Sequence, residues 1–355
     1  MSDVRPLEAA DIPAVAELFR AAMGPENELS RPWLADFLRA TLLESPWLDP
    51  EIPSLVAPSD DGGIAGFIGS NVRPVVVDGT RMRGACCAHL VVDENARSRA
   101  LGPQLLGRYM AGPQDITFTD TATEVVGRLW RSFGGRADGQ RSCGWMLVLR
   151  PRAWTVAVGR ARVQGRRAPG LVNVPALPFH LGGSRLTGHT ESETGPPAQT
   201  EVLTPALLVE HKDVILKGVR VHLDYEEPYV AWLLRQLDGL YATSVVVRKL
   251  VRIGGRPVGW FVYVHDPGGP GRVLQVASRE RDTDAVFAAL VGDARERGVM
   301  VLTGRLEPNL VEPLRKRWAI LGFDARTLVH AQDTKVLDAL ATGPALLTRL
   351  DGEWW

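Results

Sequence analysis

The residues best suited to binding a ligand lie in a basic loop near position 100, between an apolar and an amphipathic stretch. Residues 88–92 form an apolar run typical of a buried strand, and apolar residues after Pro103 have helical spacing. Pro103 suits a first helical turn, because the amide hydrogen it lacks has no partner there. Arg97, Arg99 and Gly102 lie between the two segments. Guanidinium groups, unpaired amides and the positive end of a helix would converge there, which predicts a phosphate-binding site.

The elements that must position this loop follow from hydrophobic periodicity and turn residues. Residues 4–7 indicate a first strand, followed by two helices and a three-strand meander with turns at 60–63 and 77–80. After the loop come a strand at 116–120, a helix at 125–133 and a closing strand at 144–149. This order predicts an α/β fold of mixed α+β character, in which helices flank a twisted mixed sheet.

This half of the chain resembles the GNAT-fold acyl-CoA N-acyltransferases over roughly residues 3–150. The resemblance rests on the opening Val-Arg-Pro-Leu strand and Asp-Ile-Pro helix, on the Arg-x-x-Gly/Ala-x-Gly loop at 97–102, and on residues 129–135. In that family the loop wraps the pyrophosphate of coenzyme A. The resemblance therefore implies acetyl-CoA as co-substrate, no metal, and coenzyme contacts from Leu90, Val92, Arg97, Ser98, Arg99, Ala100, Leu101 and Gly102.

Two positions depart from the family pattern. Ala100 stands where glycine is common, so its methyl group intrudes on the loop, and a positive φ there would carry a conformational cost. Trp130 stands where many of the enzymes that this chain resembles place a tyrosine acid. An indole cannot donate a proton at physiological pH, so either the thiolate leaves unaided or another group supplies the proton.

Acyl transfer to an amine needs a group that removes the proton of the amine, and three residues near the loop are candidates. His89 lies in the motif strand, Asp120 ends the following strand, and Glu124 begins the next helix. Each has a structural alternative: His89 as a hydrogen-bonded residue of the sheet, Asp120 as a helix cap, and Glu124 as a partner of the helix dipole. We keep all three as candidate catalytic residues.

Residues 151–205 differ in composition from the sequence before them. The arginines between 150 and 167 are accompanied by no acid, and Pro/Gly-rich and then Ser/Thr/Glu-rich sequence follows. We expect a linker or an inserted loop, with a short strand at 154–158. The arginines are either an ordinary solvated surface or a patch for phosphate or RNA.

The second half, residues 206–355, repeats the element order of the first half with little identity, which indicates an internal duplication. The segment that corresponds to the basic loop at 97–102 is residues 278–284. It contains no glycine, and its three acids would repel a pyrophosphate. We therefore expect two GNAT-like domains, at 1–150 and 206–355, of which the second is degenerate and has no coenzyme site. Its acids form either an acidic surface or a receptor for a cationic acceptor; they are Asp224, Glu226, Glu227, Asp351 and Glu353.

The bulk composition is that of a globular protein, with 45% hydrophobic and 23% charged residues. Because 41 basic and 41 acidic residues cancel, no net field attracts nucleic acid or an anionic membrane. No apolar run approaches the length of a bilayer span, and the first residues lack a signal-peptide core, so we expect a cytoplasmic protein. The cysteines lack metal-ligand spacing and fit small buried hydrophobes.

Three functions are compatible with these patterns. The leading one is an acetyl-CoA-dependent N-acyltransferase that moves an acetyl group to the amine of a small molecule, without a membrane or nucleic-acid partner. The second keeps the fold but takes the acyl group from an aminoacyl-tRNA, which the basic span at 150–167 would bind. The third is a non-catalytic coenzyme A-binding regulatory or scaffold module, suggested by Trp130 and the degenerate second half.

Overall fold

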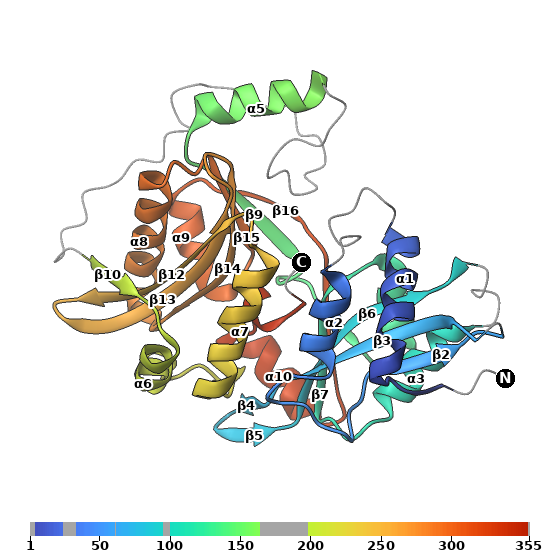
Figure 1. The fold of residues 1–355 in the computed structure, drawn as a ribbon. Helices are drawn as coiled ribbons and strands as arrows, with labels where there is room; N and C mark the ends of the chain where they lie inside the picture. Colours follow the sequence, from blue (N-terminus) through green and yellow to red (C-terminus); the bar gives the residue numbers. More distant parts are fainter. Residues whose placement is uncertain (1–3, 24–32, 61, 95–99, 164–197, 354–355) are drawn as a thin grey trace.

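The structure is a computed structural model of the 355-residue chain, and it describes residues 4–23, 33–60, 62–94, 100–163 and 198–353. Within these ranges, two seven-stranded mixed sheets with helices on their faces stand side by side, and a four-stranded sheet joins them (Figure 1). Of the predicted loop, Arg97, Ser98 and Arg99 lie outside the described residues.

The first sheet comes mainly from the N-terminal half. Its strand order is β1 (Arg5–Pro6), β2 (Leu55–Pro58), β3 (Ile64–Val72), β6 (Gly84–Val92), β7 (Ile116–Ala122), β17 (Arg326–Ala331) and β8 (Arg136–Asp138). Its helices are α1 (Ile12–Met23), α2 (Leu34–Leu42), α3 (Leu101–Met110) and α4 (Glu124–Ser132). Strand side chains alternate between two layers: Phe67 and Val91 pack with α1 and α2, whereas Ile68 and Cys87 pack with α3 and α4.

The second sheet has the same layered construction. Its strand order is β10 (Ala198–Val202), β12 (Val245–Ile253), β13 (Arg256–His265), β14 (Pro270–Ser278), β15 (Val301–Arg305), β9 (Cys143–Val148) and β16 (Ile320–Phe323). Its helices are α6 (Pro205–Ile215), α7 (Glu227–Leu240), α8 (Thr283–Glu296) and α9 (Val311–Lys316). Trp260 and Leu274 pack with α6 and α7 on one face, and Phe261 and Val276 pack with α8 and α9 on the other.

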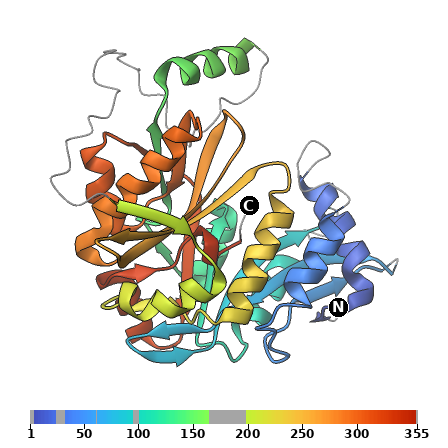
Figure 2. The ribbon, with the colours of Figure 1, turned by 60° about the vertical axis from the view of Figure 1, so that its left-hand side comes forward.

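The remaining elements connect the two units. The small sheet has the order β18 (Ala345–Leu346), β11 (Val221–Leu223), β4 (Val75–Val77) and β5 (Thr80–Met82), so its hydrogen bonds cross between the halves of the chain. Helix α10 (Thr334–Thr342) lies beside it, and α5 (Pro151–Val163) extends outward from the second unit (Figures 1 and 2). Four short 3-10 segments complete the described chain: η1 (Ala9–Asp11), η4 (Glu280–Asp282), η5 (Pro308–Leu310) and η6 (Arg349–Asp351).

The repeated order of elements is present in the structure. In the first unit, β3 pairs antiparallel with β6, which pairs parallel with β7, and α3 and α4 follow β6 and β7. In the second unit, β13, β14 and β15 repeat this arrangement, with α8 and α9 in the corresponding places. The predicted mixed α/β fold with two similar units is therefore confirmed.

One strand of each unit lies in the sheet of the other unit. We expected residues 144–149 to close the first sheet, but β9 pairs with β15 and β16, and β17 pairs with β7 and β8. That expectation was wrong because packing, not sequence order, decides the partner of this strand. The indole of Trp145 lies over Gly304, where a Cβ would be 2.6 Å from the ring, and its Nε1 donates to the carbonyl oxygen of Arg305 at 2.9 Å.

The region after β9 also differs from its prediction. The expected strand at 154–158 is part of α5, because Trp154 and Ala161 recur at helical spacing and are buried. Trp154 packs on Met146 of β9, while Arg160 and Arg162 are exposed. The proposed boundaries at 150 and 205 remain predictions.

Candidate functional site

Strands β6 and β7 are paired at their beginnings and then diverge, and the candidate site lies at the opening between them. Their parallel pairing ends at Cys86 and Phe118, although β6 continues to Val92. At His89 the backbone has a φ of 60°, and the register with β3 shifts beside it, as in a β-bulge. The bulge bends β6, so its backbone beyond Cys86 is left without β7 as a ladder partner.

The start of α3 lies at the end of β6. Ala100 precedes this helix with a φ of 55°, so it carries the cost of left-handed backbone, and no described side chain caps the first amides. Among the described residues, a Cβ at Gly102 would meet only Cγ2 of Val92, at 3.9 Å, so none of them fills the space over this glycine. Leu101 is buried beneath it, and Leu90 and Val92 are half-buried. Uncapped amides beside an open glycine fit the approach of an anion such as a pyrophosphate.

Trp130 supplies a second observation that favours a ligand here. Its side chain is buried in an apolar cluster that includes Leu90 and Val92. Its indole Nε1 has no hydrogen-bond partner among the described residues. An unpaired buried donor costs about 1–3 kcal/mol, which a polar partner at this position would offset.

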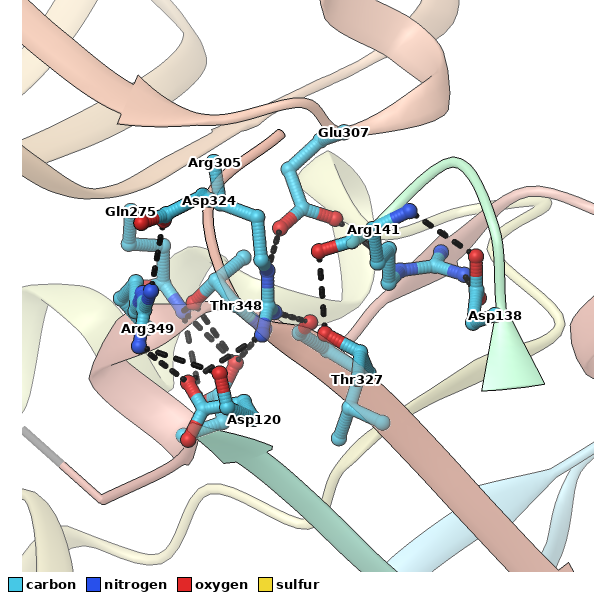
Figure 3. A network of polar contacts seen from close by, with 12 residues as sticks. Asp120, Asp138, Arg141, Gln275, Arg305, Glu307, Asp324, Thr327, Thr348 and Arg349 are labelled. Atoms are coloured by element: carbon cyan, nitrogen blue, oxygen red, sulfur yellow. Dashed lines mark hydrogen bonds and ion pairs between the residues drawn. The ribbon is translucent and has the colours of Figure 1, made fainter. Parts of the chain in front are cut away.

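Two buried carboxyl groups meet where β7 leaves the opening. The amide of Glu353 donates to Oδ1 of Asp120 at 3.1 Å, and the amide of Asp120 donates to Oε1 of Glu353 at 3.3 Å. The hydroxyl of Thr119 also donates to Oε1 of Glu353. On the other side, Arg305 and Arg349 approach Oδ2 of Asp120 at 3.2 and 3.4 Å (Figure 3). The charge of Asp120 therefore faces two guanidinium groups.

The environment of Glu353 changes its acidity. Burial, and secondly the nearby charge of Asp120, raise the pKa of Glu353 to about 7, although hydrogen bonds from Thr119 and the Asp120 amide oppose the rise. A carboxyl group with a pKa near neutrality can take a proton from an amine and release it again at physiological pH. Glu353 is therefore a further candidate for the base, alongside His89 and Asp120, and this role stays a prediction.

His89 lies beside this carboxyl group as a neutral side chain. Its Nδ1 is 3.6 Å from Oε2 of Glu353, and its ring meets that of Phe19 edge-on at a centroid distance of 5.4 Å. Burial lowers the pKa of His89 to about 3, so the imidazole carries no charge at physiological pH. The contact with Glu353 is therefore not an ion pair.

Glu124 is not part of this cluster. Its side chain is 63% exposed and forms ion pairs with Arg128 at 3.3 Å and Arg326 at 3.6 Å. The structure thus brings two of the three predicted bases, His89 and Asp120, to one place, and puts Glu124 on the surface of α4. The catalytic role of each remains a prediction.

The C-terminal segment that carries Glu353 is held from several sides. The guanidinium group of Arg73 donates to the carbonyl oxygens of Asp351 and Gly352 at 3.0 and 3.3 Å. The hydroxyl of Tyr225 donates to the buried carboxyl group of Asp351 at 2.7 Å. At Gly352, a Cβ would lie 2.4 Å from Oδ2 of Asp120. Only glycine therefore lets this segment approach Asp120 so closely.

Glu353 is the residue that sequence reasoning missed as a base. We had grouped it with acids that could receive a cationic acceptor, and Asp224 and Glu226 of that group are instead paired with Arg81 at 3.3 and 3.1 Å. The available signal in the sequence is the pair of tryptophans that follows Glu353, because two such large apolar side chains are costly to leave in water. Nothing local connects Glu353 with Asp120, because 233 residues separate them.

The corresponding opening of the second unit is filled by the chain itself. The pairing of β14 with β15 ends at Arg272 and Thr303, and the segment around η6 enters the gap. Nε2 of Gln275 donates to Oγ1 of Thr348 at 3.0 Å, and Arg305 donates to the carbonyl oxygen of Leu347. This filling agrees with the expectation of a single coenzyme site, which remains a prediction.

Other features of the described residues add no site. A cavity of about 690 Å³ lies between β8, α10 and the end of β14, and its rim mixes Arg136 and Lys217 with Glu280, so it indicates no ligand class. Within the described ranges, no helix is both long and apolar enough to cross a bilayer. Among the same residues, no three or more His, Cys, Asp and Glu side chains are grouped as metal ligands.

Solved structures share this architecture. A GCN5-related N-acetyltransferase from Anabaena variabilis ATCC 29413 matches 95% of this chain and 74% of its own, with a TM-score of 0.59 and 14% identity. Two further structures are similar. A "Probable N-Acyltransferase" from Enterococcus faecalis V583 matches 93% of this chain and 72% of its own, with a TM-score of 0.57 and 11% identity. A GCN5-related N-acetyltransferase from Kribbella flavida matches 94% of this chain and 72% of its own, with a TM-score of 0.56 and 14% identity. The chain has the GNAT fold. No protein-family model and no curated protein sequence matches it. The GNAT likeness spans both units, so the exchanged strands lie within it.

The raised pKa of Glu353 predicts that Glu353→Gln stabilises the protein at alkaline pH. A carboxyl group with a higher pKa in the folded than in the unfolded state favours folding while protonated, and this contribution is lost as the pH rises through about 7. At about 1.4 kcal/mol per pKa unit, we expect the variant to gain up to roughly 3 kcal/mol at about pH 9 and nothing at about pH 4. Urea unfolding of both proteins across this range measures the difference. A difference that does not change with pH would contradict the assignment.

Proposed function

We propose that this protein is an acetyl-CoA-dependent N-acyltransferase that acetylates the amine of a small molecule in the cytoplasm. The observation that carries the proposal is Glu353, a buried carboxyl group with a pKa of about 7 beside the opening between β6 and β7. The names of two GNAT-fold neighbours as N-acetyltransferases support it. A small acceptor suits the proposal because the base lies inside the protein rather than on its surface.

The coenzyme side of the proposal uses the first unit. Acetyl-CoA supplies the acetyl group as a thioester. The amides at the start of α3 and the guanidinium of Arg97 hold its pyrophosphate, and Gly102 lets the backbone approach the phosphates closely. Leu90 and Val92 of β6 would contact its apolar arm.

The proton of the amine goes to Glu353 in this proposal. In its ionised form, Glu353 accepts the proton that the nitrogen loses as the new N–C bond forms. Asp120 already forms ion pairs with Arg305 and Arg349, and we assign the proton to Glu353. Because Trp130 has no acidic proton, the thiolate departs without protonation from α4, which its low basicity permits. In this proposal Asp120 and His89 form the surroundings of Glu353 and do not themselves take the proton.

The test combines acetyl-CoA titration with an assay of thiol release in the presence of a panel of small primary amines. We expect saturable binding and release that depends on the amine. Failure to bind acetyl-CoA would refute the proposal. Saturable binding without turnover of any amine would favour the coenzyme-binding scaffold, whereas salt-sensitive binding of tRNA without binding of acetyl-CoA would favour the aminoacyl-tRNA-dependent transferase.

A further inference from the structure

The pair of carboxyl groups at the candidate site is completed by the second unit. Asp120 belongs to β7 of the first sheet, whereas Arg305 ends β15 of the second sheet and Glu353 follows η6. Nη1 of Arg305 is 3.2 Å from Oδ2 of Asp120, and both side chains are at most 3% exposed. Because Asp120 and Glu353 are hydrogen-bonded to each other, the charge of Arg305 acts on both carboxyl groups.

Arg305 is held in place by partners other than Asp120. Its Nε donates to Oε1 of Glu307 at 3.0 Å, and its Nη2 donates to the carbonyl oxygen of Leu347. Glu307 in turn accepts from Nε of Arg141 at 3.1 Å (Figure 3). The guanidinium group is therefore positioned by the second unit and presented to Asp120, rather than drawn into place by Asp120 alone.

We propose that Arg305 is a positioning residue that sets the protonation of the Asp120–Glu353 pair, and with it the pH range in which Glu353 acts as a base. Two neighbouring buried carboxyl groups ionise together more readily when a cation offsets their repulsion. Arg305 provides that cation from a unit for which we expect no coenzyme site. The rate prediction below rests on the proposed function, whereas the titration prediction does not.

Other charged or titratable groups also face the pair, and they remain when Arg305 is changed. Arg349 is the second cation, 3.4 Å from Oδ2 of Asp120, and its other nitrogen binds Asp324 at 2.7 Å. Burial raises the pKa of both thiols in β6, so these are neutral near pH 7. In the described part of the chain, the groups around the pair are His89, Cys86 and Cys87 of β6, Arg73 after β3, Glu307 after β15, Asp324 after β16, and Arg349 and Asp351 of η6.

The experiment compares Arg305→Met with Arg305→Lys. Carboxyl carbons of the pair, labelled with ¹³C, are followed by NMR as a function of pH, and kcat is measured over the same range. In Arg305→Met we expect the upper pKa of the pair to rise by about 1 to 3 pH units, because an opposite charge at this distance is lost. The acidic limb of kcat moves by the same amount, and the rate returns at alkaline pH. Arg305→Lys keeps the charge and shows a smaller shift.

Arg315→Met is the matched control, because this exposed arginine of α9 pairs only with Glu312 in the described contacts, and no shift is expected. Equal loss of activity at every pH, or an unmoved pKa in folded Arg305→Met, would overturn the inference. If Arg305→Met does not fold, Arg349→Met takes its place and must show a shift in the same direction. A moved pKa without turnover of any amine refutes the proposed function alone, whereas turnover with an unmoved pKa refutes only the role of Arg305.

Discussion

Glu353→Gln is expected to lower kcat for acetyl transfer by about 10²- to 10⁴-fold, the usual contribution of a general base, without weakening acetyl-CoA binding. An amide cannot take the proton of the amine. The change is nearly isosteric, and the amide oxygen can still accept from the hydroxyl of Thr119 and the amide of Asp120. Steady-state kinetics with the best amine, together with titration of acetyl-CoA, measures both expectations.

The matched control is Glu312→Gln, since Glu312 lies 60% exposed on α9 and pairs with Arg315, so its rate should not change. The wild-type rate should rise with pH through about 7, because only ionised Glu353 acts as the base. If Glu353→Gln keeps the wild-type rate, Glu353 is not the base, and the same measurements on Asp120→Asn and His89→Gln then decide between the remaining buried candidates.

Gly102→Asp is expected to weaken acetyl-CoA binding by about tenfold or more while leaving the fold at least as stable. No described residue fills the space over Gly102, and an acid in the first turn of a helix is favourable by about 0.3–1 kcal/mol. The same carboxylate would occupy the proposed place of the pyrophosphate and repel it. Calorimetric titration with acetyl-CoA and thermal unfolding measure the two effects separately.

Gly292→Asp provides the control for the added charge. Gly292 lies in α8 of the second unit, and a Cβ there has no atom within 4 Å, so the new side chain also enters open space. We expect acetyl-CoA affinity to be unchanged. Wild-type affinity in Gly102→Asp would show instead that the phosphates do not bind at the start of α3.

Much of the fold could be predicted because it depends on residues that are close in sequence. The apolar run at 88–92 forms the end of β6, and the apolar spacing after Pro103 forms α3. The turns at 60–63 and 77–80 join β2 to β3 and β4 to β5 as antiparallel pairs. In each case, periodicity or turn chemistry acts over a few residues, so no distant contact was needed.

The predictions that were wrong required knowledge of distant contacts. The pattern of β9 indicates a strand but does not specify a sheet, and the fit of Trp145 over Gly304 places it in the second one. Residues 154–158 are rich in β-branched residues, yet burial of Trp154 against Met146 stabilises a helix. Glu353 was not predicted as a base for the same reason. The sequence does not indicate which carboxyl group has a raised pKa, because the shift depends on contacts in the folded protein.

By itself, the sequence determined the types of most elements, though not of α5, together with the glycine at the start of α3 and the acids available for catalysis. Only the tertiary structure decided which acids meet. Burial in the folded protein raises the pKa of Glu353 most, and the charge of Asp120, 233 residues away in the sequence, adds to the rise. Desolvation and charge act through space, so the residue type predicts a carboxyl group, whereas the fold determines the pH at which it can serve as a base.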